Sequence, residues 1–317
     1  MQKRKLGNTD LHVAPITFGC NVFGWTANEK TSFEILDAFT AAGFNFLDTA
    51  DVYAKWATGV GGESETIIGK WTKQRNNRSK VIIATKAGMV DAVGSINITK
   101  AYIIKAAEQS LKRLQTDYID LYQTHKDDVS VPVEETLEAH QQLIKEGKVR
   151  FIGASNFSAA RLKASLEASK KHNLPYYQTL QPLYNLYDRE VFEKELEPLC
   201  VANNIAVINF YSLAAGFLTG KYRTEADIAK SARGARVAST YLNEKGLRIL
   251  KTLDEVAAQY KTTTGSIAMA WLLARPSVTA PIASASNLVQ LQELLKSVDL
   301  KLSPETITQL NNASSST

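Results

Sequence analysis

Short apolar segments that alternate with helical patterns along most of the chain restrict its fold more than any other feature. Eight such segments are predicted to be strands, and the first seven end roughly 28 to 39 residues apart, about the length of one strand–helix unit. Eight strands alternating with helices predict a closed (β/α)8 barrel. The predicted strands are Ile16–Cys20, Phe44–Ala50, Val81–Lys86, Tyr118–His125, Val149–Asn156, Thr179–Tyr184, Ile205–Ser212 and Val278–Ala283.

Helix start and stop signals fall between these strands. Thr99 and Ser158 are suitable N-caps, Pro132 suits a first helical turn, and Gly147 stands where a helix would end. An open, doubly wound sheet is the competing architecture, because it shares the alternation of strands and helices. The first strand is not followed by the GxGxxG pattern, and similar strands continue to eight, so the barrel is favoured.

Three segments depart from the repeat. The stretch from Lys5 to Pro15 is predicted to form a small hairpin ahead of the first strand. About 70 residues separate the last two strands, and we expect the piece from Gly216 to Arg236, rich in glycine, lysine and arginine, to be a loop over the site. The tail from Asn311 to Thr317 is expected to be loose. The whole chain, 1–317, is predicted to be one domain.

Composition excludes several classes of protein. The chain has 317 residues, of which 44% are hydrophobic and 22% charged, as in ordinary globular proteins. No apolar run is long enough to span a bilayer, and Met1–Gly7 lacks the apolar core of a signal peptide, so we expect a cytoplasmic protein with no membrane partner. The net charge of +5 is scattered among acidic residues, which argues against a nucleic-acid partner. Cys20 and Cys200 are predicted to be free, buried thiols.

Four polar residues at or just beyond three neighbouring strand ends suggest a site. Asp48 ends one strand, Tyr53 follows five residues later, and Lys86 and His125 end the next two strands. Asp48 is a natural counter-ion for Lys86 at the rim of an apolar barrel, and the lysine is expected to lower the pKa of Tyr53. Taken separately, Asp48 and Lys86 could be only an ion pair at the rim, Tyr53 could be a surface tyrosine, and His125 could be a histidine whose hydrogen bonds are satisfied within the protein. Together they can polarise and protonate a carbonyl oxygen.

These residues lie within motifs that span nearly the whole chain, and the sequence thereby resembles the aldo-keto reductases. The resemblance implies an NAD(P)H-dependent carbonyl reductase with Tyr53 as general acid, Lys86 and Asp48 tuning its acidity, and His125 orienting the carbonyl. The motifs are Gly43-Phe44-Asn45-Phe46-Leu47-Asp48-Thr49-Ala50-Asp51-Val52-Tyr53, Thr85-Lys86, Asp117–His125, Gly153-Ala154-Ser155-Asn156-Phe157, Gln181–Leu186, Tyr211-Ser212-Leu213, Gly220-Lys221-Tyr222 and Ala285-Ser286-Asn287 with Gln290 and Glu293.

The resemblance also implies which residues bind the cofactor. It assigns Ser155, Asn156 and Gln181 to the nicotinamide carboxamide and Tyr211 to the face of the ring, and it counts Asp48 among the cofactor-binding residues. Amide and hydroxyl groups can pair with a carboxamide, and an aromatic face can hold the ring flat. The implied pyrophosphate clamp is Ser212, Leu213, Gly216, Leu218 and Lys221, and the implied adenosine end is Ser284, Ser286, Gln290 and Glu293.

The sequence departs from the family pattern at several positions. Some relatives carry arginine for the 2′-phosphate where this chain has Ser284–Asn287, and Leu294 replaces a common asparagine. Arg233 or Arg236 could supply the missing charge, so NADPH is predicted ahead of NADH. Ala54 replaces the glycine that commonly follows the catalytic tyrosine.

Aromatic residues in the loops after the first two strands predict the substrate. Phe23, Trp25 and Trp56 would form an apolar mouth suited to small-molecule aldehydes or ketones with an apolar body, although packing roles are equally compatible with their positions.

Three other functions fit parts of the pattern. The chain could be a redox-sensing subunit that holds NADP(H) with little turnover, as channel β-subunits of similar fold do. It could use Lys86 for a Schiff base, as aldolases do. A metal hydrolase built on Asp48, Asp51 and His125 is less favoured, since no tight His-x-His pair is present, and no metal is predicted.

Overall fold

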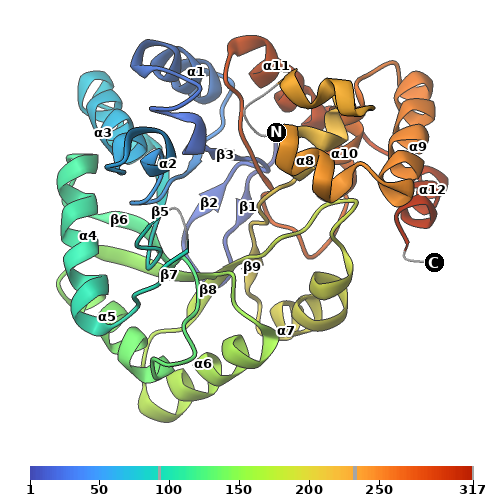
Figure 1. Ribbon diagram of the computed structural model, residues 1–317. Helices are drawn as coiled ribbons and strands as arrows, with labels where there is room; N and C mark the ends of the chain where they lie inside the picture. Colours follow the sequence, from blue (N-terminus) through green and yellow to red (C-terminus); the bar gives the residue numbers. More distant parts are fainter. Residues whose placement is uncertain (92–93, 231–233, 316–317) are drawn as a thin grey trace.

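Eight parallel strands form one curled sheet at the centre of the molecule (Figure 1). The computed structural model describes residues 1–91, 94–230 and 234–315. Each predicted strand contains or overlaps an observed one, and most observed strands are shorter. The strands are β3 (Thr17–Gly19), β4 (Phe46–Asp48), β5 (Ile82–Ala87), β6 (Ile119–Thr124), β7 (Val149–Ser155), β8 (Tyr177–Gln181), β9 (Ala206–Val207) and β10 (Ile282–Ala283).

The order of the strands confirms the predicted barrel. The sheet runs β10-β3-β4-β5-β6-β7-β8-β9, with every neighbouring pair parallel. Its two edges also meet: the Val207 carbonyl accepts the Thr279 N–H at 2.8 Å, and the Asn209 carbonyl accepts the Ile282 N–H at 2.9 Å. The carboxyl ends of all eight strands therefore face one end of the barrel, where active sites of this fold are built.

Helices surround the sheet and begin near the predicted signals. Ser158 caps its helix by accepting the Arg161 N–H, and Gly147 follows the end of another with φ +71°. Pro132 occupies the N-cap rather than the first turn. Thr99 is the N-cap residue of its helix as predicted, although its hydroxyl donates to Asn97 Oδ1 and makes no capping hydrogen bond. The helices are α1 (Glu29–Ala41), α2 (Lys55–Thr58), α3 (Glu63–Arg75), α4 (Lys100–Leu114), α5 (Val133–Lys145), α6 (Ala159–His172), α7 (Glu197–Ala202), α8 (Gly234–Tyr241), α9 (Glu244–Tyr260), α10 (Thr264–Leu273), α11 (Leu288–Lys296) and α12 (Pro304–Ser314).

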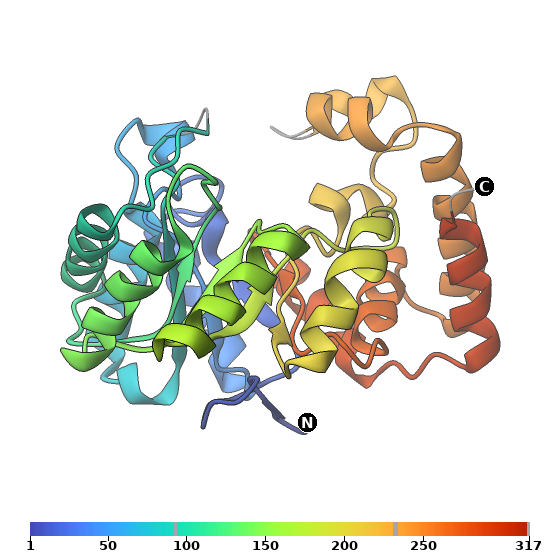
Figure 2. The same cartoon turned by 90° about the horizontal axis from the view of Figure 1, so that it is seen from below.

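The long interval between β9 and β10 is more helical than predicted. It contains two 3₁₀ segments, Ala214–Thr219 and Glu225–Lys230, followed by α8, α9 and α10. Figures 1 and 2 show α8, α9 and α12 grouped at one side of the barrel. The prediction of a loose tail is wrong as far as Ser314, because α12 continues to that residue and its hydroxyl accepts a hydrogen bond from Arg189 at 2.7 Å.

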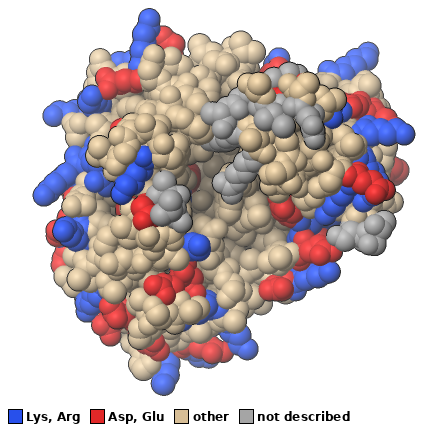
Figure 3. Space-filling view, in the orientation of Figure 1, with Lys and Arg blue, Asp and Glu red and all other residues tan. Residues whose placement is uncertain are grey.

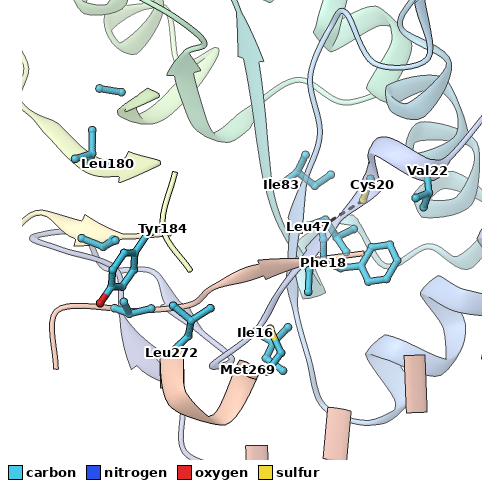
Figure 4. Close-up of a cluster of buried hydrophobic side chains, with 14 of the residues drawn as sticks. Ile16, Phe18, Cys20, Val22, Leu47, Ile83, Leu180, Tyr184, Met269 and Leu272 are labelled. Atoms are coloured by element: carbon cyan, nitrogen blue, oxygen red, sulfur yellow. Dashed lines mark hydrogen bonds between the residues drawn. The ribbon is translucent and has the colours of Figure 1, made fainter. Parts of the chain in front are cut away.

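Two apolar cores hold the barrel together. The larger lies between the outer faces of the strands and the helices, and includes Phe18, Leu47 and Ile83 (Figure 4). The smaller fills the barrel near the amino ends of its strands, where Leu6 from the hairpin packs with Phe46 and other inward residues.

The predicted hairpin is confirmed and closes this lower end. It is formed by β1 (Arg4–Lys5) and β2 (His12–Val13), and it lies at the opposite end of the molecule from α8 (Figure 2). The Arg4 guanidinium donates to the carbonyls of Leu273, Val278 and Thr279, which ties the hairpin to the last part of the barrel. Among the described residues, no helix is both long and apolar enough to cross a membrane.

Candidate active site

A buried ion pair lies at the carboxyl ends of β4 and β5. Lys86 Nζ is 2.8 Å from each carboxylate oxygen of Asp48 and donates a further hydrogen bond to the Thr49 carbonyl at 2.8 Å. Both side chains are almost completely inaccessible to solvent, and burial lowers the pKa of Lys86. An unpaired charge here would cost several kcal/mol, so the two residues depend on each other.

Tyr53 lies against this pair at the edge of the cleft and is partly exposed. Lys86 Nζ is 4.8 Å from the centre of its ring, and the His125 ring centre is 6.1 Å away. Burial and the Asp48 charge raise the pKa of Tyr53 well above its usual value. The expectation that Lys86 would lower this pKa is therefore wrong, because burial and the nearby Asp48 charge both favour the protonated phenol. The phenol holds its proton throughout the physiological range.

His125 follows the end of β6 and is held in place by its backbone. Its N–H donates to the Ala87 carbonyl at 2.8 Å, and its carbonyl accepts from Asn156 Nδ2 at 2.9 Å. Burial, followed by the charge of Lys86, lowers the pKa of His125 well below its ordinary value, so the ring is neutral at pH 7. Its Nδ1 atom is buried without a hydrogen-bond partner in the described part of the chain. A neutral imidazole in this setting can donate one N–H to a substrate oxygen.

Two glutamines complete the polar layer around Asp48. Gln181 Nε2 donates to Asp48 Oδ1 at 2.9 Å, and Gln123 Nε2 reaches the same oxygen at 3.3 Å. Sequence reasoning missed Gln123. Its position two residues before His125 within the predicted strand Tyr118–His125 was the available signal, because alternate residues of a strand face the same side.

The structure brings together the residues predicted to meet the nicotinamide. Ser155 Oγ donates to the Gln181 carbonyl at 3.1 Å, and Asn156 Nδ2 donates to Ser155 Oγ at 3.1 Å. Asn156 and Tyr211 both have left-handed backbones, with φ of +53° and +55°. Such a conformation is unusual for an aromatic residue and is typical of functional sites. The Tyr211 carbonyl is held by Asn185 Nδ2 at 3.0 Å.

Only some residues of the predicted pyrophosphate clamp are exposed to solvent. Gly216 has φ +96°, and a Cβ there would lie 2.9 Å from Lys221 Cε, so glycine lets this lysine approach the backbone. The Ser212 hydroxyl is buried and bonded to Asn209, and Leu218 is fully buried, while Leu213 is partly exposed. Lys221 is thus the exposed cation of this set.

The predicted adenosine end lies at the junction of β10 and α11. The Ser284 hydroxyl donates to Asn21 Oδ1 at 2.7 Å, and the Ser286 hydroxyl lies 3.0 Å from that of Thr26. Gln290 Oε1 accepts the Ser286 N–H at 2.9 Å, and Glu293 is exposed one turn further along α11. Arg233, proposed for the 2′-phosphate, lies outside the described residues, as does the side chain of Arg236.

Aromatic residues line one side of the cleft mouth. The rings of Trp25 and Trp56 are 5.5 Å apart, and Trp56 is 6.0 Å from Tyr53. Phe23 does not join them: it is fully buried and stacks on Phe18 at 5.5 Å, so its place at the mouth was predicted wrongly. Where its border consists of described residues, the hollow over the barrel in Figure 3 is lined mainly by uncharged residues.

Ala54, beside Tyr53, stands where the family resemblance implies a glycine. It has φ +70° and precedes α2, in a left-handed conformation that glycine adopts without strain. Alanine is strained in this conformation, and Lys86 Nζ still lies 4.8 Å from the centre of the Tyr53 ring.

A second cavity, of about 460 Å³, lies behind the site between the loops after β4 and β5 and helix α4. Asp51 lines it together with Tyr102 and Arg113. Burial and the charge of Glu65 raise the pKa of Asp51 to about 8, and its Oδ1 has no hydrogen-bond partner in the described part of the chain.

Comparison with known proteins agrees with this geometry. A family model described as "Aldo/keto reductase family" matches residues 15–315. A Bacillus subtilis protein named "Uncharacterized oxidoreductase YrpG" is 36% identical over 98% of this chain and 95% of its own length. The B. subtilis "Aldo-keto reductase YhdN" is 33% identical over 98% of this chain and 93% of its own. An Arabidopsis thaliana "Probable voltage-gated potassium channel subunit beta" is 32% identical over 95% of this chain and 92% of its own.

Proposed function

Because the chain belongs to the aldo/keto reductase family, an oxidoreductase family, we propose that it reduces aldehyde or ketone carbonyls to alcohols with NADPH, and that Tyr53 is the general acid. One observation carries the proposal: a protonated, partly exposed Tyr53 lies close to both the Lys86 ammonium and the neutral His125 ring at the carboxyl end of the barrel. This arrangement is suited to an oxygen atom on which negative charge develops.

Each residue has a separate task in this proposal. When bound, reduced nicotinamide supplies the hydride that goes to the carbonyl carbon. His125 donates its N–H to the carbonyl oxygen and orients it, and the Tyr53 hydroxyl transfers its proton to that oxygen. The phenolate left behind is stabilised by Lys86, whose own charge Asp48 holds in place. Tyr53 then regains a proton from solvent before the next turnover.

The residues present suit a nicotinamide cofactor. Gln181 Oε1 accepts no hydrogen bond from the described residues and is available to a carboxamide. Tyr211 lies four residues beyond the end of β9, with its backbone held in a strained conformation. Lys221 offers a positive charge next to the open backbone at Gly216. On the sequence alone, the 2′-phosphate of NADPH is assigned to Arg233 or Arg236.

The substrate class follows from the mouth of the cleft. Trp25 and Trp56 present aromatic surface beside Tyr53, and Trp56 is 42% exposed, so an aldehyde or ketone with an apolar body can gain contact there. A simple aromatic aldehyde is therefore the substrate for the first assay.

The test compares Tyr53→Phe with Tyr176→Phe, the same chemical change at an exposed tyrosine far along the chain. Loss of a general acid is expected to reduce aldehyde turnover about 10²- to 10⁴-fold. NADPH binding, followed by cofactor fluorescence, should change less than about twofold, and Tyr176→Phe should match the wild type. Full turnover by Tyr53→Phe would exclude its proposed role. Parallel titrations with NADPH and NADH test the cofactor preference.

A second candidate is a redox-sensing subunit that binds NADP(H) with little turnover. The similarity to plant proteins named as probable channel β-subunits favours it. The intact set of Tyr53, Lys86 and His125 favours the enzyme. Tight retention of NADPH with negligible turnover across a panel of carbonyl compounds would support the subunit instead.

A further inference from the structure

Gln123 extends across the inner face of β7 at a position where that strand has a glycine, Gly153. In the strand register, Gln123 on β6 pairs with Lys86 on one side and Gly153 on the other, and Gly153 pairs with Thr179. A Cβ at Gly153 would lie 3.0 Å from Gln123 Cγ and would also collide with the Thr179 hydroxyl. Because β7 has no side chain at this level, the Gln123 carboxamide passes over it toward Gln181 on β8.

The contacts of the two glutamines fix the orientation of the Gln181 amide. Gln181 Nε2 donates to Asp48 Oδ1 at 2.9 Å and to Gln123 Oε1 at 3.4 Å, which occupies both of its N–H groups. The opposite orientation would place the Gln181 oxygen against the Asp48 carboxylate and the Gln123 oxygen, where no proton is available. Gln123 itself stays in place because its Nε2 donates to the same Asp48 oxygen, at 3.3 Å.

We propose that Gln123 is a positioning residue for the cofactor: it holds the Gln181 amide so that Gln181 Oε1 faces the cleft and accepts a hydrogen bond from the amino group of the nicotinamide carboxamide. This inference rests on the proposed function, since it needs a nicotinamide cofactor in the cleft. Gln123 is fully buried, so it can act on a bound cofactor only through its neighbours. Its effect is carried by Gln181.

A cofactor analogue separates this role from packing. The 3-acetylpyridine analogue of NADP⁺ keeps the carbonyl of the carboxamide and replaces its amino group by a methyl group. A protein whose Gln181 oxygen accepts from that amino group should bind NADP⁺ about 5- to 10-fold more tightly than the analogue, the ratio typical of one well-made hydrogen bond. The ratio of the two dissociation constants, measured by calorimetry, is the readout.

The variant is Gln123→Met, which keeps the length of the side chain and removes its hydrogen bonds. The matched control is Thr179→Val, in the same layer, because the Thr179 hydroxyl is buried without a partner and loses no hydrogen bond. We expect the preference for NADP⁺ to shrink about fivefold in Gln123→Met and to stay at the wild-type value in Thr179→Val. Gln123→Asn, too short to reach Gln181, should reproduce the loss and serves as the measurement if Gln123→Met does not fold.

Each other outcome has a definite meaning. If both Gln123 variants weaken NADP⁺ and the analogue equally, Gln123 is only a packing residue and the inference is wrong. If the wild type binds both with equal affinity, Gln181 Oε1 does not meet the amino group, and the inference is again wrong. If the wild type binds neither, the proposed function itself fails and takes the inference with it.

Discussion

The two ends of the barrel carry buried ionic networks that differ in how fully their polar groups are paired. At the amino end, the Asp120 carboxylate accepts from Arg78 at 2.8 Å, from Arg150 at 3.0 Å and from the Ile83 N–H at 3.0 Å. At the carboxyl end, the Asp48–Lys86 pair is equally well satisfied. Its neighbours are not: His125 Nδ1 and Gln181 Oε1 accept no hydrogen bond from the described residues.

This difference in hydrogen-bond pairing distinguishes polar residues that stabilise the fold from those available to bind a ligand. The Arg78 guanidinium at the amino end also donates to the Val81 and Tyr118 carbonyls, and these hydrogen bonds join the segments that lead into β5 and β6. At the carboxyl end, by contrast, polar atoms beside the cleft have no hydrogen-bond partner among the described residues. Breaking the first network should affect stability alone, whereas breaking the second should affect stability and turnover together.

The largest effect is expected from Lys86→Met. It leaves the Asp48 carboxylate buried without its cation, and such changes cost about 3–5 kcal/mol of unfolding free energy. Turnover should be lost as well. The double variant Asp48→Asn with Lys86→Met removes both charges, so urea denaturation should show most of the stability restored while turnover stays absent. If the double variant were as unstable as the single one, an uncompensated charge would not be the cause.

Asp120→Asn is expected to be the next largest. It weakens the contacts to two guanidinium groups, which can partly recover by reaching water, so a loss of about 2–3 kcal/mol is expected. Aldehyde turnover under stabilising conditions should stay within about twofold of the wild type, because Asp120 lies at the far end of β6. Reduced turnover in a protein that keeps its denaturation midpoint would contradict the separation between the two ends.

Much of the carboxyl end could be predicted because strand periodicity and residue type fix which residues reach it. Asp48, Lys86 and His125 each lie at or near the carboxyl end of a predicted strand, and the parallel sheet brings those strand ends together. The barrel itself followed from the number and spacing of those runs. Local sequence also located several helix ends, since capping depends on near neighbours.

The features that sequence did not predict depend on distant contacts. The pKa of Tyr53 rises because of burial and the charge of Asp48, and the placement of Gln123 needs the absence of a side chain at Gly153 on the next strand. Phe23 belongs to the core because it meets Phe18, which its position in a loop did not reveal. The helices between β9 and β10 were obscured by a composition rich in glycine and charge, near Gly216.

A pH-dependent effect is expected from Asp51→Asn, behind the site. The pKa of Asp51 is about 8 in the folded protein and near 3.8 when unfolded, so the folded state holds the extra proton between these values. The stabilisation of the folded state by this bound proton is complete below about pH 4 and is lost as the pH rises through 8. The variant should match the wild type near pH 4 and be more stable at pH 9 by about 1–3 kcal/mol, discounted for partial exposure.

Urea denaturation at pH 4, 7 and 9 would measure this change. A variant that is less stable than the wild type at pH 9 would show that the ionised Asp51 carboxylate is well paired, most directly by Arg113 across the cavity. The carboxyl end would then be as fully satisfied as the amino end, and the contrast between them would not hold at this position.

The smallest effect is expected from Asp10→Asn, at the exposed margin of the amino-end network. Asp10 accepts from Arg150 Nη2 at 3.0 Å, but its side chain is 67% exposed, so water and salt already screen the pair. A loss below about 0.5 kcal/mol is expected, shrinking further in high salt. Arg150 also binds the buried Asp120, so the single variants Asp10→Asn and Asp120→Asn compare an exposed and a buried partner of one guanidinium. The double variant measures the coupling between the two carboxylates. Equal costs for the two single variants would mean that burial does not set the strength of this network.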